Sequence, residues 1–251
     1  MPVFGAVIVF IAQYAYIPVS PELDGVKGKP RVFIVMDYSE ARLNMVENQI
    51  RTNRVTDALV IEAMNTLPRE AFVGAGQEGI AYIDEDIQIA PGRYLMEPMV
   101  LARLLQAAEV RESDVVLDIG CGTGYAAAVL SRLANTVVAL ESDAALAAQA
   151  TQTLSTLEID TVAVVEGALQ DGYPKQAPYD VIFFGGAVSD VPAAIAGQLA
   201  ENGRLVAVTH KKGVGTGTLI TNHRGVLSRR ELFDAATPFL PGFEPAPEFV
   251  F

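Results

Sequence analysis

Three glycines at alternate positions follow a short apolar run that contains an aspartate. The stretch reads "VVLDIGCGTGY" and covers residues 115–125, with Asp118 before the glycines at 120, 122 and 124. A turn from the end of a strand to the start of a helix leaves backbone N–H groups unpaired, and glycines let a ligand approach them closely. Glu141 ends the next apolar run, 23 residues after Asp118. Acids at two neighbouring strand ends favour a bound ligand over a glycine turn that serves packing alone.

The spacing of the glycines identifies the class of ligand. A dinucleotide site needs G-x-G-x-x-G, but Tyr125 stands where the third glycine should be. The pattern D-x-G-x-G-x-G resembles motif I of methyltransferases that use S-adenosylmethionine (SAM). In that role Asp118 balances the cofactor's ammonium, the start of the following helix favours its carboxylate, and Glu141 takes both ribose hydroxyls. The predicted cofactor-binding residues are Asp118, Gly120, Cys121, Gly122, Thr123, Gly124, Glu141, Ser142, Ala168 and Leu169.

Short strands and helices alternate around these residues. Five apolar runs without alternation, "VVLDI", "TVVALE", "TVAVVE", "YDVIFFGG" and "RLVAVTH", are typical of strands buried on both faces. Helical stretches lie between them ("YAAAVLSRLA", "AALAAQATQTLSTLE" and "VPAAIAGQLA"), which predicts right-handed crossovers. Residues 215–233 hold two extended runs around "NHRG" and predict an antiparallel hairpin. The predicted fold class is α/β: a doubly wound, mostly parallel, Rossmann-like sheet.

The chain divides into residues 1–35, an N-terminal helical cap at 36–108 and the α/β core at 109–251. Within the cap, residues 56–67 predict a helix that begins with Thr56 or Asp57 as its N-cap and ends at Pro68. Its expected apolar face holds Leu59, Ala63, Met64 and Leu67. Residues 82–98 predict an irregular connector, and residues 99–110 an apolar helix.

The first 35 residues leave three interpretations open. Residues 3–19 carry no charge and are about as long as the shortest membrane span. They lack the basic start and cleavage site of a signal peptide. A membrane anchor and a docked, β-rich appendage are both compatible with this pattern. The favoured interpretation is that Met36 is the true start, because the residues after it read as a soluble helix.

Composition narrows the function. The formal net charge is −12 and no basic run occurs, which disfavours a nucleic-acid partner. Cys121 is the only cysteine, so a reducing, cytoplasmic compartment is expected. With two histidines and one cysteine, no metal site is expected. We also expect a monomer that does not bind membranes.

From about Arg42 onward the chain resembles the protein-L-isoaspartate O-methyltransferase family. The resemblance rests on "MVENQIR", "VIEAMNTLPREAFV", "AYIDEDIQI", the "EP" before "MVLARLL", the glycine motif with its flanking strands, "YDVIFFGGAVSDVPAAIAGQLAENGRLVAV" and "FDAATPFLPGF". It implies a SAM-dependent enzyme that methylates isoaspartyl carboxylates of damaged proteins as the first step of repair. It also implies a rearrangement of the last strands of the sheet.

The chain departs from the family pattern at two places. The family's T-I-S-Q-P segment, whose serine lies at the methyl-transfer site, here reads Tyr94, Leu95, Met96, Glu97 and Pro98. Met96 replaces the serine, so no catalytic residue is assigned. The family's G-D-G aspartate, which reaches the adenine amino group, is replaced by Ala168. Asp171 is near in sequence and could compensate.

Five further features have two interpretations each. Residues 210–213, "HKKG", form either a solvated loop or an attractor for an anionic group. Arg93 is either a surface arginine or a bidentate partner for a carboxylate. The ring of Tyr125 and the thiol of Cys121 are expected to pack rather than react. The "DED" at residues 84–86 is expected to be a connector near the cofactor rather than a metal site.

The sequence thus predicts a SAM-dependent O-methyltransferase that acts on isoaspartyl residues. Two alternatives remain. One is a divergent methyltransferase with another acceptor, and the other is a SAM-binding regulatory protein that has lost catalysis.

Overall fold

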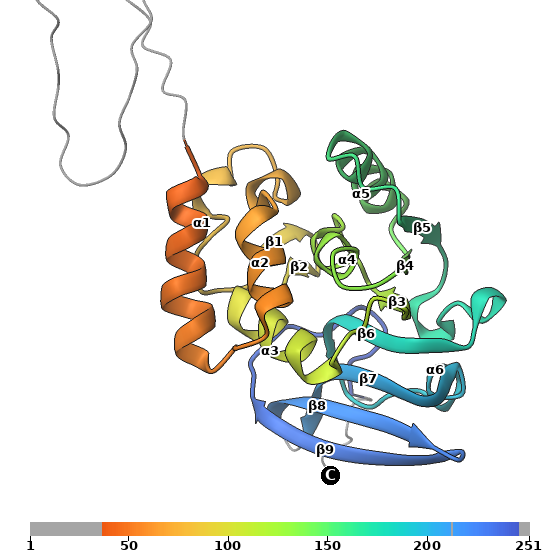
Figure 1. Cartoon of the computed structure of the whole chain (residues 1–251). Coiled ribbons are helices and arrows are strands. Elements are labelled where there is room, and N and C mark those ends of the chain that lie inside the picture. The colour runs from red at the N-terminus through yellow and green to blue at the C-terminus, as the bar shows by residue number, and fades with distance from the viewer. Residues whose placement is uncertain (1–36, 212, 246–251) are drawn as a thin grey trace, which may run out of the picture.

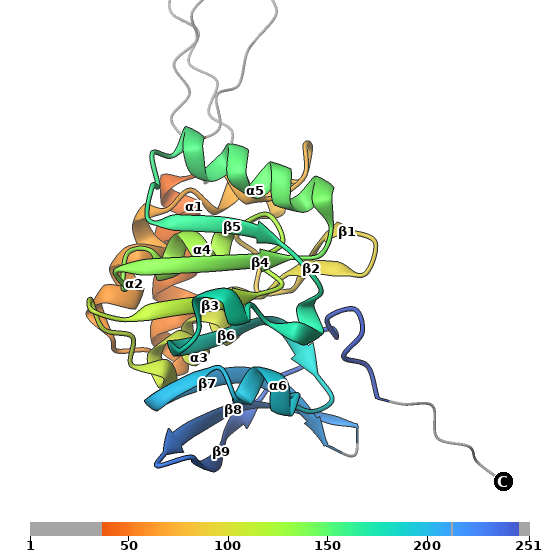
Figure 2. The same cartoon turned by 90° about the vertical axis from the view of Figure 1, so that its right-hand side faces the viewer.

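The computed structural model describes residues 37–211 and 213–245, and a single seven-stranded sheet dominates it. The strand order is β5-β4-β3-β6-β7-β8-β9 (Figures 1 and 2). The strands are β3 (Val115–Ile119), β4 (Thr136–Glu141), β5 (Val162–Glu166), β6 (Tyr179–Val188), β7 (Leu199–Lys211), β8 (Val214–His223) and β9 (Val226–Asp234). The first five strands in that order run parallel, and β8 and β9 add an antiparallel edge. This confirms the predicted mostly parallel sheet and its C-terminal hairpin.

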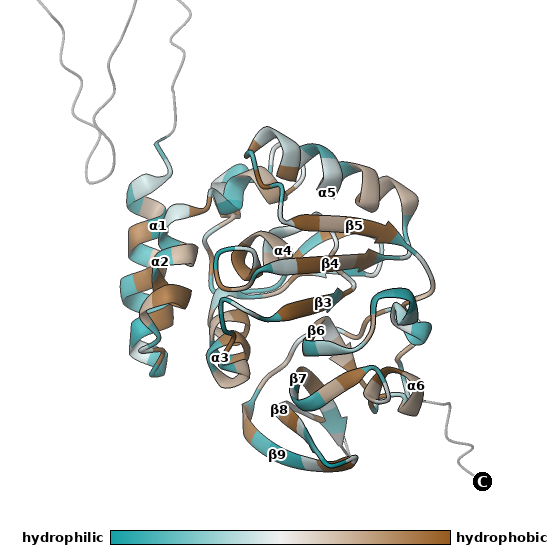
Figure 3. Ribbon diagram, turned by 45° about the vertical axis from the view of Figure 1, so that its right-hand side comes forward, coloured by the Kyte–Doolittle hydropathy of each residue, from teal (hydrophilic) through white to brown (hydrophobic). Residues whose placement is uncertain are grey.

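The central strands form because their residues can be buried on both sides. Brown, hydrophobic segments follow β3, β4 and β5 in Figure 3. Residues 116–119 of β3 and 137–141 of β4 are all buried. A strand covered on both faces needs apolar side chains at every position rather than at alternate ones. Asp118 and Glu141 are therefore exceptions that need a reason.

Helices cover the two faces unequally. The helices α3 (Pro98–Ala108), α4 (Tyr125–Leu130) and α5 (Ala144–Thr156) pack on the same face of the sheet, within one hydrophobic cluster. On the opposite face lie the four-residue α6 (Ala193–Ala196), the 3-10 turns Leu169–Asp171 and Pro174–Gln176, and the C-terminal segment. The long helix predicted over "VPAAIAGQLA" is wrong, since Gly197 ends α6 and β7 begins at Leu199.

The N-terminal helices extend the better-covered face. They are α1 (Ser39–Met45), a π-helical turn (Val46–Ile50), a 3-10 turn (Arg51–Asn53) and α2 (Ala58–Thr66). Asp57 is the N-cap of α2, because its side chain accepts hydrogen bonds from the N–H groups of Leu59 and Val60. Three residues of the predicted apolar face, Ala63, Met64 and Leu67, are buried. The fourth, Leu59, is 56% exposed, and Val60 and Ile61 are buried in its place.

The segment predicted as an irregular connector contains a small hairpin. Its strands are β1 (Ile87–Ala90) and β2 (Arg93–Leu95), which pair antiparallel around a turn at Pro91 and Gly92. Two further 3-10 turns, Arg69–Phe72 and Glu78–Ile80, precede it. The prediction failed here because strands of four and three residues are too short to show a periodic pattern.

After β9 the chain returns to the parallel part of the sheet. The N–H of Ala187 on β6 donates to the carbonyl of Pro238 at 2.8 Å, and the N–H of Leu240 donates to the carbonyl of Ala187 at 2.9 Å. Residues 235–243 therefore lie against the C-terminal end of β6.

Within residues 37–211 and 213–245, no helix is long and apolar enough to span a membrane. The three interpretations of residues 1–35 fall outside the described residues.

Candidate functional site

The glycine turn lies where β3 ends, between β4 and β6. Gly120 has φ +79°, and a Cβ there would lie 2.7 Å from Cδ2 of Leu240. Gly124 has φ +95° and is the N-cap of α4. Both positions need the left-handed backbone that glycine adopts without strain. The chain passes from β3 to β4 on one side of β3, and from β5 to β6 on the other side. Open α/β sheets bind ligands at such a switch point.

Asp118 is fully buried behind this turn. Neither carboxyl oxygen has a hydrogen-bond partner within the described part of the chain. Burial raises the pKa of Asp118 to about 8; the nearby Glu141 adds to the rise, and Arg93 opposes it. A buried polar group without a partner is costly. Asp118 is therefore a candidate contact for a ligand group with hydrogen-bond donors.

Glu141 is also fully buried, and its carboxylate is saturated with donors. Arg93 on β2 binds it with both terminal nitrogens, one on each oxygen. The backbone N–H groups of Gly122, Ser142 and Asp143 donate to the same carboxylate at 2.8, 2.7 and 3.0 Å. Arg93 is 4% exposed, so the interpretation as a surface arginine is wrong. The bidentate partner is a carboxylate of the chain itself.

Side chains close the crevice around the glycines. The cavity next to them has a volume of about 20 Å³ and is lined by Ile89, Tyr94, Leu95, Met96, Leu101, Gly120, Cys121, Tyr125, Ala126, Phe183 and Gly185. That space suits about one water molecule. A Cβ on Gly122 would lie 2.7 Å from Cδ1 of Ile89, so β1 lies directly over the turn. A cofactor of nucleotide size therefore requires side chains to move.

The remaining predicted cofactor residues occupy different environments. Cys121 is buried and burial raises its thiol pKa well above the ordinary value, as expected of a packing residue. Thr123 is buried and its hydroxyl donates to the carbonyl of Phe72 at 2.5 Å. Ser142 and Ala168 are exposed near the ends of β4 and β5. Leu169 belongs to the hydrophobic cluster on the opposite face of the sheet.

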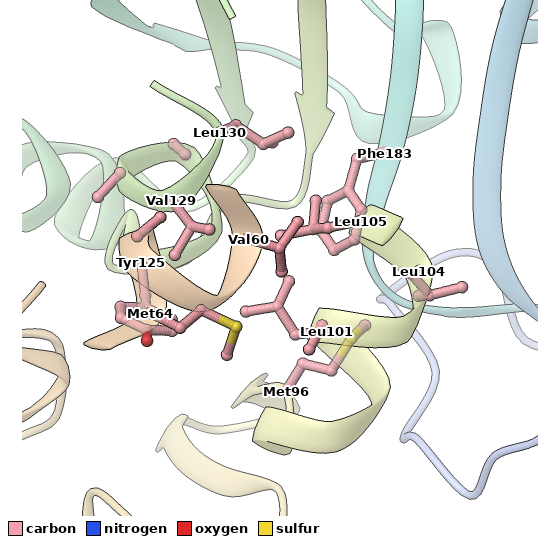
Figure 4. Close-up of a cluster of buried hydrophobic side chains, with 14 of the residues drawn as sticks. Val60, Met64, Met96, Leu101, Leu104, Leu105, Tyr125, Val129, Leu130 and Phe183 are labelled. Carbon is pink, nitrogen blue, oxygen red and sulfur yellow. The ribbon is translucent and has the colours of Figure 1, made fainter. Parts of the chain in front are cut away.

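Met96 lies in an apolar environment. Figure 4 shows its side chain among buried hydrophobic residues that include Leu101, Met64 and Tyr125. It is 5% exposed and lines the small cavity beside Gly120. A thioether therefore occupies the position where the family pattern has a hydroxyl. As predicted, Tyr125 packs: its ring meets that of Phe72 edge-on at 5.3 Å between centroids.

Arg69 holds the segment around Met96 in place. It is fully buried; its Nε donates to the carbonyl of Ala81 at 2.6 Å and its Nη2 to the carbonyl of Met96 at 2.8 Å. Its guanidinium lies 4.8 Å from the centroid of the Tyr125 ring. Arg69 thus joins the 3-10 turn, the segment around Met96 and the helix after the glycines.

Glu97 adds negative charge next to Met96. Partial burial, together with Asp86, Asp84 and Glu85, raises its pKa to about 7. Burial also raises the pKa of Asp86 to about 6, although its carboxylate accepts a hydrogen bond from the N–H of Glu97 at 2.9 Å. The acids of the "DED" connector and Glu97 therefore form one acidic cluster beside the crevice.

His210 and Lys211 are the last residues of β7, so the interpretation as a loop is wrong for these two residues, whereas Gly213 lies in a turn. His210 lies against the ring of Phe239, 4.4 Å between centroids. It lines an open groove of about 680 Å³ with Ser189, Asp190, Arg229, Arg230 and Glu231. Charges of both signs line this groove, and it does not reach the glycine turn.

Sequence reasoning missed three residues that shape the crevice: Arg69, Ile89 and Leu240. Arg69 belongs to "LPREAFV", which was recognised as a motif without a role for its arginine. Ile89 and Leu240 touch the glycines from segments distant in sequence. No periodic pattern reports such contacts.

Comparison with known proteins identifies the family. The model of the protein-L-isoaspartate(D-aspartate) O-methyltransferase family matches residues 40–222. A protein-L-isoaspartate O-methyltransferase of Koribacter versatilis (strain Ellin345) is 38% identical over 82% of this chain and 94% of its own length. Another, from Methylorubrum extorquens (strain PA1), is 41% identical over 68% of this chain and 75% of its own length.

Solved structures agree on the fold. A protein-L-isoaspartate O-methyltransferase superposes with a TM-score of 0.71 at 26% identity, covering 80% of this chain and 66% of that one. A Plasmodium falciparum chain assigned to the same class, solved with S-adenosyl-L-homocysteine, gives a TM-score of 0.69 at 21% identity over 78% of this chain and 96% of its own. With a family model that covers most of its length and relatives of this similarity, the chain belongs to the protein-L-isoaspartate(D-aspartate) O-methyltransferase family.

Proposed function

We propose that this protein binds SAM at the glycine turn and methylates the carboxylate of L-isoaspartyl residues in damaged proteins. Its family is one of SAM-dependent enzymes with this activity. The observation that carries the assignment to this site is Asp118, a fully buried carboxyl without a partner among the described residues, beside the bare backbone of Gly120. A cofactor that brings an ammonium group supplies the missing partner.

The residues present fit the cofactor. Asp118 would hold the ammonium and Glu141 the ribose hydroxyls, while the backbone of Gly120 to Gly124 allows close approach. When bound, SAM supplies a methyl group activated by a sulfonium. Ala168 has no acceptor for the adenine amino group, so this end of the pocket relies on apolar and backbone contact, at a loss of about 0.5–1.5 kcal/mol of binding.

The chain needs no general base for this reaction. The acceptor is a carboxylate with an ordinary pKa of about 3.9, so it is ionised at neutral pH. The work left to the protein is to align the acceptor with the methyl group and to exclude water. Arg69 positions the segment around Met96, and the hydrophobic cluster below it keeps this side of the crevice dry.

One observation favours a second candidate function, methyl transfer to an acceptor that is not an anion. Met96 offers no hydroxyl to orient a carboxylate, and the acidic cluster of Asp84, Glu85, Asp86 and Glu97 repels one. A neutral or cationic acceptor would meet no such penalty.

The test is methyl transfer from radiolabelled SAM to an isoaspartyl peptide and to the same peptide with a normal aspartyl residue. SAM binding is measured beside it by calorimetry. Transfer to the isoaspartyl peptide alone supports the proposal. Binding without transfer to either peptide refutes the acceptor and leaves the cofactor site standing. Absence of binding refutes both.

We also propose that the protein acts as a cytoplasmic monomer without nucleic-acid or membrane partners, and that residues 36–108 serve as a cap over the crevice. The net charge of −12 supports the absence of a nucleic-acid partner, because a phosphate backbone would be repelled. The contact of Ile89 with Gly122 supports the cap.

A further inference from the structure

Arg93 occupies the position that the proposed function gives to the cofactor's ribose. Its two terminal nitrogens bind the two oxygens of Glu141, and the other donors are three backbone N–H groups and the hydroxyl of Ser142. A carboxylate has about four lone-pair sites. Glu141 therefore cannot accept two ribose hydroxyls until Arg93 has left.

Arg93 has little freedom to leave the crevice altogether. Its side chain is 5% exposed, and its Nε is buried without a partner in the described part of the chain. Its Nη2 lies 3.4 Å from the position that a Cβ would take on Gly120. A buried guanidinium that loses its carboxylate is strongly unfavourable unless a new anion replaces it. After leaving Glu141, the guanidinium therefore stays next to the glycine turn, where the amino-acid end of the cofactor is proposed to bind.

The cofactor's carboxylate needs a partner that the glycine turn supplies poorly. The N–H groups of Gly120 and Cys121 donate to the carbonyl of Leu140 at 2.8 and 3.1 Å, and that of Gly124 donates to the carbonyl of Cys121 at 2.9 Å. The helix that follows has only six residues, so its dipole is small. Glu141 repels an anion, and Asp118 does so once it has lost its proton. A guanidinium, in contrast, matches a carboxylate in shape and charge.

We propose that Arg93 is a cofactor-binding residue that exchanges one carboxylate for another. In the free protein it holds Glu141, and in the complex it holds the carboxylate of SAM. This rests on the proposed function and adds to it a residue that discriminates between cofactors with and without a carboxylate. No covalent step is involved.

The matched ligands are SAM and decarboxylated SAM, which differ only in the carboxylate. Binding of each is measured by calorimetry to the wild-type protein and to Arg93→Gln. The wild type should prefer SAM at least tenfold. In Arg93→Gln that preference should fall to threefold or less. The two affinities should move in opposite directions: SAM loses its partner, whereas the cationic decarboxylated SAM gains from the removal of a positive charge and from a free Glu141.

Arg204→Gln is the matched control. Arg204 forms an ion pair with Asp114, and the two side chains are 12% and 6% exposed. Asp114 directly precedes β3, so this pair lies at the opposite end of the strand from the glycine turn. Its loss should lower the melting temperature and leave the preference for SAM unchanged. If Arg93→Gln does not fold, Arg93→Gln with Glu141→Gln removes both charges of the pair together, and its preference should also be lost.

Three results overturn the proposal. The first is a wild type without preference for SAM, and the second is an Arg93 variant that keeps the full preference. The third is a wild type that binds neither ligand, which refutes the cofactor site itself. Because the first two leave SAM binding intact, they separate a wrong role for Arg93 from a wrong function.

Discussion

Glu97 should make the stability of this protein depend on pH. Its carboxyl is half-buried beside three other acids, and these surroundings raise its pKa from 4.5 to about 7. The folded state therefore retains a proton that the unfolded state has lost. Since the folded state binds more protons, the free energy of unfolding falls as pH rises from about 4.5 to about 7. Above that range the full destabilisation is present.

The substitution Glu97→Gln removes this effect while keeping the shape of the side chain. A fully buried carboxyl with this change in pKa would cost about 3 kcal/mol once ionised. Solvent screens a half-exposed group, so we discount that figure to about 1–2 kcal/mol. The variant should be more stable than the wild type at pH 8 by about this amount. At pH 5 most of the gain should disappear, because the folded wild type is then protonated.

Urea unfolding at pH 5 and pH 8 measures the difference directly. Glu62→Gln, at an exposed position on α2, is the control and should show no comparable change between the two pH values. Equal effects of Glu97→Gln at both pH values would refute the reasoning, since the pKa of Glu97 would then be the same in the folded and unfolded states. A larger gain at pH 5 would reverse the sign and refute it as well.

Four shorter predictions concern the crevice and its support. Binding of SAM at pH 7 should release close to one proton from Asp118, whose pKa is about 8 in the free protein. Calorimetry in buffers of different ionisation enthalpy measures the number of protons released, and no release would mean that the ammonium lies elsewhere. Glu141→Ala should weaken SAM binding at least tenfold, about 1.4 kcal/mol, and equal affinity by calorimetry would remove Glu141 from the site. Arg69→Met should lower the free energy of unfolding by about 3 kcal/mol, because two buried carbonyls lose their donors; a urea titration showing less than 1 kcal/mol would contradict its role. Met96→Ser should cost about 2–4 kcal/mol of stability by leaving a cavity among hydrophobic side chains, and an unchanged melting temperature would show that a hydroxyl fits there.

The sheet could be predicted because its signals are local. Apolar runs such as residues 115–119 and 136–141 are strands by composition, and the turn at Arg224 and Gly225 marks the hairpin. Asp57 could be proposed as a cap because an N-cap acts on its own next turn. Each of these features depends on residues a few positions apart.

The side-chain contacts that close the crevice could not be predicted from such local signals. Arg93 and Glu141 are 48 residues apart, and nothing in either neighbourhood signals the other. The exposure of Leu59 shows a related limit, since Leu59 and Val60 are both apolar and the sequence does not say which of them faces the core. The site residues could therefore be proposed as a set from the sequence, but their mutual contacts required the structure.

The segment that returns from β9 has a consequence for the order in which the protein is made. Leu240 contacts both Gly120 and Gly186, so the glycine turn is complete only when this late segment is in place. Synthesis runs from the N-terminus, and domains begin to fold while it proceeds. A nascent chain that has already emerged through β9 still lacks the side chain that covers Gly120. The turn is therefore complete only near the end of synthesis, after every strand of the sheet has been made.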